Sequence, residues 1–185
     1  MQRDEKQLIL LLRDESTRRE AFAEVVRTYQ EPLYRMVRRI VLIHEDADDV
    51  LQNTFIKAWQ GLDKFRGDSS LGTWLYRIAS HEALDHLERN KRLCASIDDD
   101  EHPGHMSLAS RLESDPYFDG DEVELQLQEA IASLPHKQRL VFNMKYYDEM
   151  KYEEMSQALG TSVGALKASY HLAVQKIAKF FGSNE

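Results

Sequence analysis

Apolar residues recur at three- and four-residue spacing along two long stretches of this chain, residues 5–92 and 125–181. That spacing places them on one face of an α-helix, and no stretch shows the alternate-residue pattern of a half-buried strand. The spacing therefore predicts an all-α protein. In the first stretch only Pro32 and the polar segment 65–70, which contains Gly67, interrupt the pattern.

Several helix boundaries follow from local chemistry. The acidic run 45–49 favours the positive end of a helix dipole and predicts a helix start there. Leu71 begins a further apolar stripe after the polar segment 65–70. In the C-terminal part the spacing predicts helices over 125–134, 135–147, 152–159 and 163–181, with Pro135 as a helix-starting residue.

Residues 93–122 separate the two helical stretches. They contain Pro103, Gly104, Pro116 and Gly120, show no sustained period, and are strongly acidic. Such a composition predicts a flexible acidic linker that its own charge repulsion extends. We therefore expect two helical domains, 1–92 and 123–185, joined by a linker over 93–122.

The net charge of −8 is concentrated in one segment. Residues 93–125 contain ten acidic residues and one basic residue, Arg111, so the rest of the chain carries about one positive charge in excess. Electrostatic interactions with phosphate are felt within a Debye length of roughly 8–10 Å. The acidic balance therefore does not exclude DNA binding by the other segments.

Other classes of protein are disfavoured. No apolar run approaches the roughly 20 residues of a membrane span, so no direct membrane insertion is expected. The first residues lack the apolar core of a signal peptide, and the single cysteine, Cys94, excludes an internal disulfide, which together indicate a cytoplasmic protein.

Catalysis is not expected either. The string His81-Glu82-Ala83-Leu84-Asp85-His86 has Asp85 where a zinc-protease motif requires histidine. The other candidate pair, His102 and His105, lies in the acidic linker. No phosphate-cradling glycine loop and no nucleophile with a base is found, so we expect no enzyme, metal or cofactor.

The stretch 152–167 has the layout of a helix-turn-helix. Met155, Ala158 and Leu159 form the apolar side of a short helix, and Gly160 is suited to the left-handed conformation that ends it. Thr161 and Ser162 are candidate caps of a second helix. That helix would present polar side chains to a major groove, namely Ser162, Lys167, Ser169 and His171. An ordinary helical hairpin gives a similar string and remains an alternative.

These residues resemble the extracytoplasmic-function sigma factors. Phe22 to about Arg92 is similar to the second conserved region of that family, and Leu125 to about Phe181 to its fourth. The matching strings are Asp46–Trp59, Phe65–Ser70, Thr73–Ala79 and Ser133–Pro135, followed by the helix-turn-helix.

The resemblance assigns the helix 46–59 to the clamp of the largest subunit of core RNA polymerase. The implied contact residues are Asp49, Gln52, Asn53, Phe55 and Trp59. Carboxylate and amide groups beside aromatic rings offer both polar specificity and apolar anchors. Alternatively, Phe55 and Trp59 belong to the core, because a stripe at helical spacing is commonly buried.

The loop 65–70 and the helix after it resemble the part that recognises and melts the minus-ten promoter element. Unpaired bases stack on aromatic side chains, each stack contributing about 1–3 kcal/mol. The implied residues are Phe65, Arg66, Asp68, Ser69, Thr73, Tyr76, Arg77 and His81, with Arg89, Lys91 and Arg92 on phosphates. Trp74 is expected to support the core, and His81 is alternatively a solvated surface histidine.

The helix-turn-helix resembles the reader of the minus-thirty-five element. The implied residues are Thr161, Ser162, Val163, Gly164, Lys167, Ser169 and His171. The sequence departs from the commoner family pattern, which places arginines where this chain has Lys167 and Ser169, and it has Leu172 and Val174 further along. The preferred bases therefore do not carry over.

The expected function is that of an alternative sigma factor, which binds core RNA polymerase, directs it to promoter DNA and opens the strands. The family also implies an anti-sigma factor that covers the polymerase- and DNA-binding faces. Two rivals stay open: an autonomous helix-turn-helix regulator, which binds duplex DNA without polymerase, and a helical scaffold that binds only proteins.

Overall fold

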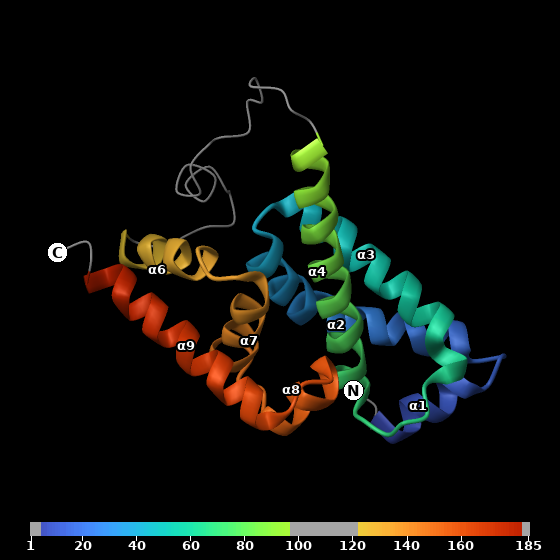
Figure 1. Cartoon of the computed structure of the whole chain (residues 1–185). Helices are drawn as coiled ribbons and strands as arrows, with labels where there is room; N and C mark the ends of the chain where they lie inside the picture. The colour runs from blue at the N-terminus through green and yellow to red at the C-terminus, as the bar shows by residue number, and fades with distance from the viewer. Residues whose placement is uncertain (1–4, 97–121, 183–185) are drawn as a thin grey trace.

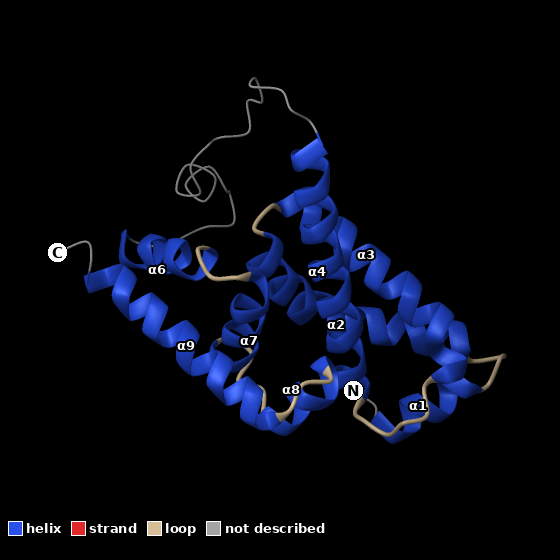
Figure 2. Ribbon diagram, in the orientation of Figure 1, coloured by secondary structure: helices blue, strands red, loops and turns tan. Residues whose placement is uncertain are grey.

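The computed structural model describes residues 5–96 and 122–182, and within these ranges the chain is α-helical with no strand (Figures 1 and 2). Its elements are, in chain order, α1 (Glu5–Arg13), α2 (Arg18–Val41), α3 (His44–Gly61), the short 3₁₀ helix η1 (Leu62–Lys64), α4 (Leu71–Ser96), α6 (Glu122–Ala132), α7 (His136–Tyr146), α8 (Tyr152–Leu159) and α9 (Val163–Gly182). The all-α expectation is confirmed. No described helix is both long and apolar enough to cross a bilayer.

The N-terminal helices pack around one apolar core. α2, α3 and α4 contact one another in all three pairs, and α1 lies against α2 (Figure 1). Fully buried side chains at helical spacing supply the centre: Leu33, Met36, Val37 and Ile40 from α2, Val50 from α3, and Leu71 and Leu75 from α4. α2 continues through Pro32 as one helix.

Local hydrogen bonds fix where α4 begins. The Ser70 hydroxyl accepts the Thr73 amide at 3.0 Å, which is a side-chain cap of the first turn. The Glu5 carboxylate of α1 accepts the Leu71 amide at 2.7 Å. A carboxylate near the positive end of a helix dipole is favourable, so α1 and the loop 65–70 are tied to the start of α4.

The helix-turn-helix is confirmed in α8 and α9. Gly160 has φ 62°, the left-handed conformation that ends α8, and its amide donates to Ser156. The Ser162 hydroxyl accepts the Ala165 amide at 3.3 Å and so caps α9. α7 begins directly after Pro135, one residue later than the spacing predicted.

The two helical parts pack against each other. α7 contacts α2 and α4, and α8 contacts α4, so that the apolar core continues from the N-terminal helices into Leu140, Met144 and Met155 (Figure 1). α4 extends to Ser96 and α6 begins at Glu122, so all but the ends of the expected linker 93–122 lies outside the described residues.

Candidate nucleic-acid and protein interfaces

One face of α3 is directed to solvent. Asp49, Gln52 and Asn53 are exposed along it, and Trp59 is 43% exposed at its C-terminal end. Phe22 of α2 packs against the Trp59 ring in an edge-to-face geometry, with ring centroids 5.1 Å apart. Phe55 is half-buried, and its centroid lies 6.4 Å from that of Phe22. The four exposed residues of the predicted set therefore share one surface, while Phe55 also packs against the core.

Ile56 belongs to the same face, and the sequence prediction missed it. Its side chain is 48% exposed although it is apolar. The signal was present, because Ile56 follows Asn53 by three residues and precedes Trp59 by three, which is the spacing of one helix face. An exposed isoleucine beside an exposed tryptophan is typical of a protein contact surface.

The loop after η1 forms a small cavity with the start of α4. Its volume is about 230 Å³, and it is lined by Lys64, Phe65, Arg66, Asp68, Ser69, Trp74 and Arg77. Five of the residues expected at the minus-ten element thus come together here. Lys64 and Trp74 complete the lining, although the sequence prediction did not include Lys64. We call this cavity the loop pocket.

Trp74 separates the loop pocket from a second cavity of about 310 Å³. The Phe65 and Trp74 rings lie 4.8 Å apart at a tilt of 36°, so Phe65 packs on one side of the indole. A Cβ atom added to Gly61 would lie 3.3 Å from the indole, which shows how closely α3 approaches it. Trp74 both closes the core, as expected, and forms a wall of two cavities.

The second cavity contains the exposed His81. Its lining is Lys57, Gly61, Lys64, Trp74, Ile78, His81 and Glu82. Lys57 forms an ion pair with the buried Glu82 carboxylate. Lys57 was not among the predicted residues, and only the pairing of α3 with α4 brings it beside His81.

Two residues of the predicted minus-ten set are turned inward. Thr73 is 6% exposed, and its hydroxyl is hydrogen-bonded to that of Ser70 at 2.8 Å. Tyr76 is half-buried. Its burial is the main cause, and the nearby Asp148 carboxylate the second, that raises the pKa of Tyr76 to about 12. Arg89 and Lys91 are exposed on α4, whereas the Arg92 side chain lies outside the described residues.

The N-terminal half of α9 presents its polar side chains outward. Ser162, Gly164, Lys167 and His171 are exposed, and Thr161, Val163 and Ser169 are partly exposed. The Lys167 ammonium lies 5.6 Å from the centre of the Tyr152 ring, so it rests over α8 in this structure. Buried Leu166 and Ala173 hold the opposite face of α9 in the domain.

Side chains of α7 reach the C-terminal end of α2. The Arg139 guanidinium donates to the Ile40 carbonyl oxygen at 2.8 Å, and the Asn143 amide donates to the Arg39 carbonyl oxygen at 3.3 Å. The last four carbonyl groups of a helix lack hydrogen-bond donors within the helix, and α7 supplies donors for two of those in α2. Burial lowers the pKa of Arg139 to about 10.

A partly buried ion pair lies beside these bonds. Arg39 Nη1 is 3.0 Å from Asp148 Oδ1, with side-chain exposures of 22% and 9%. The Arg39 guanidinium also lies 4.4 Å from the centre of the Tyr147 ring. Burial raises the pKa of Asp148, although Arg39 opposes that effect. We call Arg39, Ile40, Arg139, Asn143 and Asp148 the α2–α7 seam.

The described residues hold no cluster of three or more metal-ligating side chains. His86, the last residue of the zinc-protease-like string, lies 3.1 Å from Asp46 and 3.0 Å from Asn90, so its Nε2 atom is engaged within the helical core. His102 and His105 lie outside the described residues.

Comparison with known proteins matches both helical parts to one family. The family model of Sigma-70 region 2 matches residues 25–93, and that of Sigma-70 region 4 matches residues 124–177. The ECF RNA polymerase sigma-E factor of Salmonella typhimurium is 32% identical over 176 residues, which cover 91% of each chain. The ECF RNA polymerase sigma factor SigW of Bacillus subtilis is 29% identical over 168 residues, which cover 86% of this chain and 88% of SigW.

Solved structures share the fold. CnrH, solved in complex with the cytosolic domain of CnrY, is similar with a TM-score of 0.68 and 24% identity, covering 96% of this chain and 98% of that one. The sigma factor RpoE of Bartonella quintana, solved with the anti-sigma factor NepR, gives a TM-score of 0.68 at 19% identity, covering 89% and 98%. The two matched regions, their order and the sigma-E similarity show that the chain belongs to the ECF sigma factors of bacterial RNA polymerase.

Proposed function

We propose that this sigma factor binds core RNA polymerase through the exposed face of α3, melts the minus-ten element around the loop pocket, and reads the minus-thirty-five element with α9. The observation that carries the proposal is the loop pocket itself. Phe65, Arg66, Asp68, Ser69 and Arg77 line one cavity, and they are five of the residues that the family resemblance assigns to minus-ten recognition. Members of this family are not known to catalyse a reaction of their own, and none is proposed.

The chemistry of the loop pocket suits an unpaired base. Phe65 and Trp74 offer aromatic surface, on which a stacked base gains about 1–3 kcal/mol. Asp68 and Ser69 offer hydrogen-bonding groups for base edges, and Arg66 and Arg77 offer positive charge for the adjacent backbone. A base can enter the pocket only after it has left its base pair. Binding in the pocket therefore stabilises the open strands relative to the duplex.

The two DNA readers have to separate on a promoter. Elements near positions minus ten and minus thirty-five lie about 25 base pairs apart, which is about 85 Å of duplex at roughly 3.4 Å per step. In this structure α9 follows directly on α8, and α8 packs against α4, the helix that contributes to the minus-ten site. We infer that the α2–α7 seam breaks when the factor engages polymerase and both elements, so the described arrangement is a closed form.

We also propose an anti-sigma factor as a regulatory partner. The support is the fold similarity to sigma factors that were solved with anti-sigma partners. A partner that covers the exposed α3 face or holds the two halves together would favour the inactive state. Co-purification from the native host should recover such a protein; recovery with polymerase subunits alone would argue against it.

One reconstitution tests the main proposal. Purified chain is added to core polymerase and a genomic DNA library without another factor, and RNA start sites are mapped. We expect initiation at a defined set of promoters. The autonomous-regulator alternative predicts instead tight binding to duplex DNA without polymerase, and the scaffold alternative predicts no DNA contact in either state. Absence of measurable association with core polymerase would overturn the proposal.

A further inference from the structure

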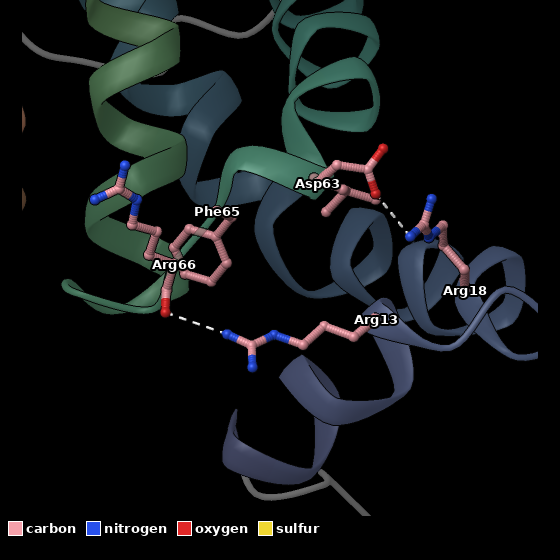
Figure 3. Close-up of a pocket in the computed structure, with 6 residues that line it drawn as sticks. Arg13, Arg18, Asp63, Phe65 and Arg66 are labelled. Atoms are coloured by element: carbon pink, nitrogen blue, oxygen red, sulfur yellow. Dashed lines mark hydrogen bonds and ion pairs between the residues drawn. The ribbon is translucent and has the colours of Figure 1, made fainter.

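A third cavity lies between α1, the start of α2, and the η1 segment with its following loop (Figure 3). Its volume is about 420 Å³, and its lining is Arg13, Arg18, Leu62, Asp63, Phe65 and Arg66. The resemblance assigned no role to Arg13 or Arg18. Two guanidinium groups from the first two helices therefore line one cavity, and that of Arg13 meets the loop that carries the expected minus-ten residues.

The two arginines differ in how they are satisfied. Arg18 Nη2 forms an ion pair with Asp63 at 2.8 Å, and Arg18 Nε donates to the Leu12 carbonyl oxygen at 3.0 Å. Arg18 thus joins α2 to η1, and its charge is balanced. Arg13 Nη2 donates to the Arg66 carbonyl oxygen at 3.2 Å. Within the described part of the chain, Arg13 has no carboxylate partner.

The chemistry of this cavity fits a phosphate group. Arg13 is exposed and has several N–H donors left over, because a guanidinium has five and its hydrogen bond to the Arg66 carbonyl oxygen uses one. The planar fork of arginine matches phosphate oxygens in a two-bond geometry. Leu62 and Phe65 add an apolar wall on which the sugar of a nucleotide can rest.

The cavity adjoins the loop pocket. Phe65 and Arg66 line both, so the two cavities lie on either side of the same short segment. Figure 3 shows Arg13 reaching the backbone oxygen of Arg66, while the Arg66 side chain is directed away from Arg13. Because Phe65 and Arg66 line both cavities, a strand with one base in the loop pocket would bring a neighbouring phosphate near Arg13.

We propose that the Arg13 cavity binds a backbone phosphate of the unwound DNA strand, next to the nucleotide whose base is held in the loop pocket. The inference rests on the proposed minus-ten function and adds a contact from α1. Arg18 and Asp63 act as positioning residues, because their ion pair fixes the start of α2 against η1, on the side of the cavity opposite the loop. The hydrogen bond to Arg66 holds the Arg13 guanidinium at the loop.

The first test compares charge-matched variants in the holoenzyme. Binding of a single-stranded minus-ten oligonucleotide is measured over a range of salt concentrations for wild type, Arg13→Ala, Arg13→Lys and Arg19→Ala. Arg19 is exposed on α2 and lies outside the cavity lining, so Arg19→Ala removes the same charge without removing the contact. We expect Arg13→Ala to weaken binding about tenfold and to reduce the salt slope by about 0.7, the value for one single-strand phosphate. Arg13→Lys should weaken binding less, and Arg19→Ala should change neither quantity.

The second test separates phosphate contact from loop positioning. The oligonucleotide carries one neutral methylphosphonate at a time, and each position is measured with wild type and with Arg13→Ala. We expect one position at which wild type loses affinity and Arg13→Ala loses nothing further, since the two changes remove the same interaction. If every position costs both proteins equally, Arg13 only holds the loop, and the inference is wrong.

The outcomes also distinguish failure of the phosphate site from failure of the proposed minus-ten function. A wild-type holoenzyme that does not bind the oligonucleotide overturns the minus-ten proposal and this inference with it. A wild type that binds, together with Arg13→Ala that behaves like Arg19→Ala, overturns the phosphate site alone. Thermal unfolding of Arg13→Ala provides the folding check, and Arg13→Lys keeps the test valid if the alanine variant is unstable.

Discussion

The guanidinium of Arg139 on α7 donates a hydrogen bond to the main-chain oxygen of Ile40 at the end of α2, over 2.8 Å and across 99 positions of sequence. It joins the C-terminal helices, which include the proposed minus-thirty-five reader, to the helices on which we propose the minus-ten and polymerase surfaces. We infer that this hydrogen bond stabilises the closed form proposed above. The first three predictions concern this seam.

Replacing Arg139 should destabilise the folded chain. Its side chain is 6% exposed and also donates to the carbonyl groups of Ala132 and Leu134. Arg139→Met keeps apolar bulk but leaves these oxygens without their donor, so we expect the free energy of unfolding to fall by about 3 kcal/mol. Urea unfolding measures the change. Lys137→Met, at an exposed position of the same helix, is the control and should stay within about 0.5 kcal/mol of wild type.

Reversing one charge of the Arg39–Asp148 pair should open the closed form. Arg39→Glu places two carboxylates together in a partly buried site, and we expect a larger radius of gyration in small-angle scattering. Combining it with Asp148→Arg should restore the compact value. Arg35→Glu, at an exposed position of α2, should leave the radius unchanged. A double variant as expanded as Arg39→Glu would contradict a direct pairing.

The stability of the folded chain should depend on pH through Asp148. Burial raises the pKa of this carboxyl above its ordinary value of 3.8, so the folded chain binds the proton more readily than the unfolded chain. The stability contributed by Asp148 is therefore complete below pH 3.8 and is lost as pH rises through the folded-state pKa. Asp148→Asn cannot ionise, so its stability relative to wild type should increase as pH rises above about 4.

Urea unfolding at several pH values measures this difference. Glu149→Gln, at an exposed position of the same turn, is the matched control. A relative stability of Asp148→Asn that falls as pH rises would show that Arg39 dominates over burial.

Truncating the exposed apolar side chains of α3 should weaken binding to core polymerase. We expect Trp59→Ala to reduce the affinity at least tenfold, about 1.4 kcal/mol or more, since buried tryptophans dominate many interfaces. Ile56→Ala should have a smaller effect in the same direction. Leu10→Ala removes a still more exposed apolar side chain, from α1, and should bind like wild type. Equal affinities for all variants in a pull-down titration would assign the contact to another surface.

Removing the Lys167 charge should weaken binding to duplex minus-thirty-five DNA. Lys167 is exposed on α9 and rests over Tyr152, from which it can turn to a phosphate. The holoenzyme with Lys167→Ala should show a salt slope smaller by about 0.9, the value for one duplex phosphate. Lys137→Ala removes an equal charge from α7 and should leave the slope unchanged. A loss of affinity confined to particular base pairs would indicate base reading instead.

Much of the site was predictable because the signals are local. The spacing of Asp49, Gln52, Asn53 and Trp59 on one helix face follows from 3.6 residues per turn, whatever the helix packs against. The left-handed Gly160 and the Ser162 cap likewise depend only on their neighbours in sequence. Ile56 could have been found by the same spacing, but an apolar residue within a helix is normally attributed to the core.

Other features arise only when distant segments meet. Tyr76 carries a suitable group for DNA contact, yet it is partly covered near Asp148, 72 positions away. The Arg13 cavity forms only because α1 places Arg13 next to Arg66. The second cavity likewise forms only because Lys57 of α3 lies next to His81 of α4. No local pattern encodes such a pairing.

The sequence by itself determined the helices, the order of the two regions, the helix-turn-helix and the exposed face of α3, because backbone hydrogen bonding and apolar periodicity act over one or two turns. Only the tertiary structure decided which carbonyl Arg139 satisfies, which carboxylate Arg39 pairs with, and which arginine reaches the loop 65–70. Those choices depend on how packed helices place side chains in space, and that placement is set by the shape of the shared core rather than by spacing along the chain.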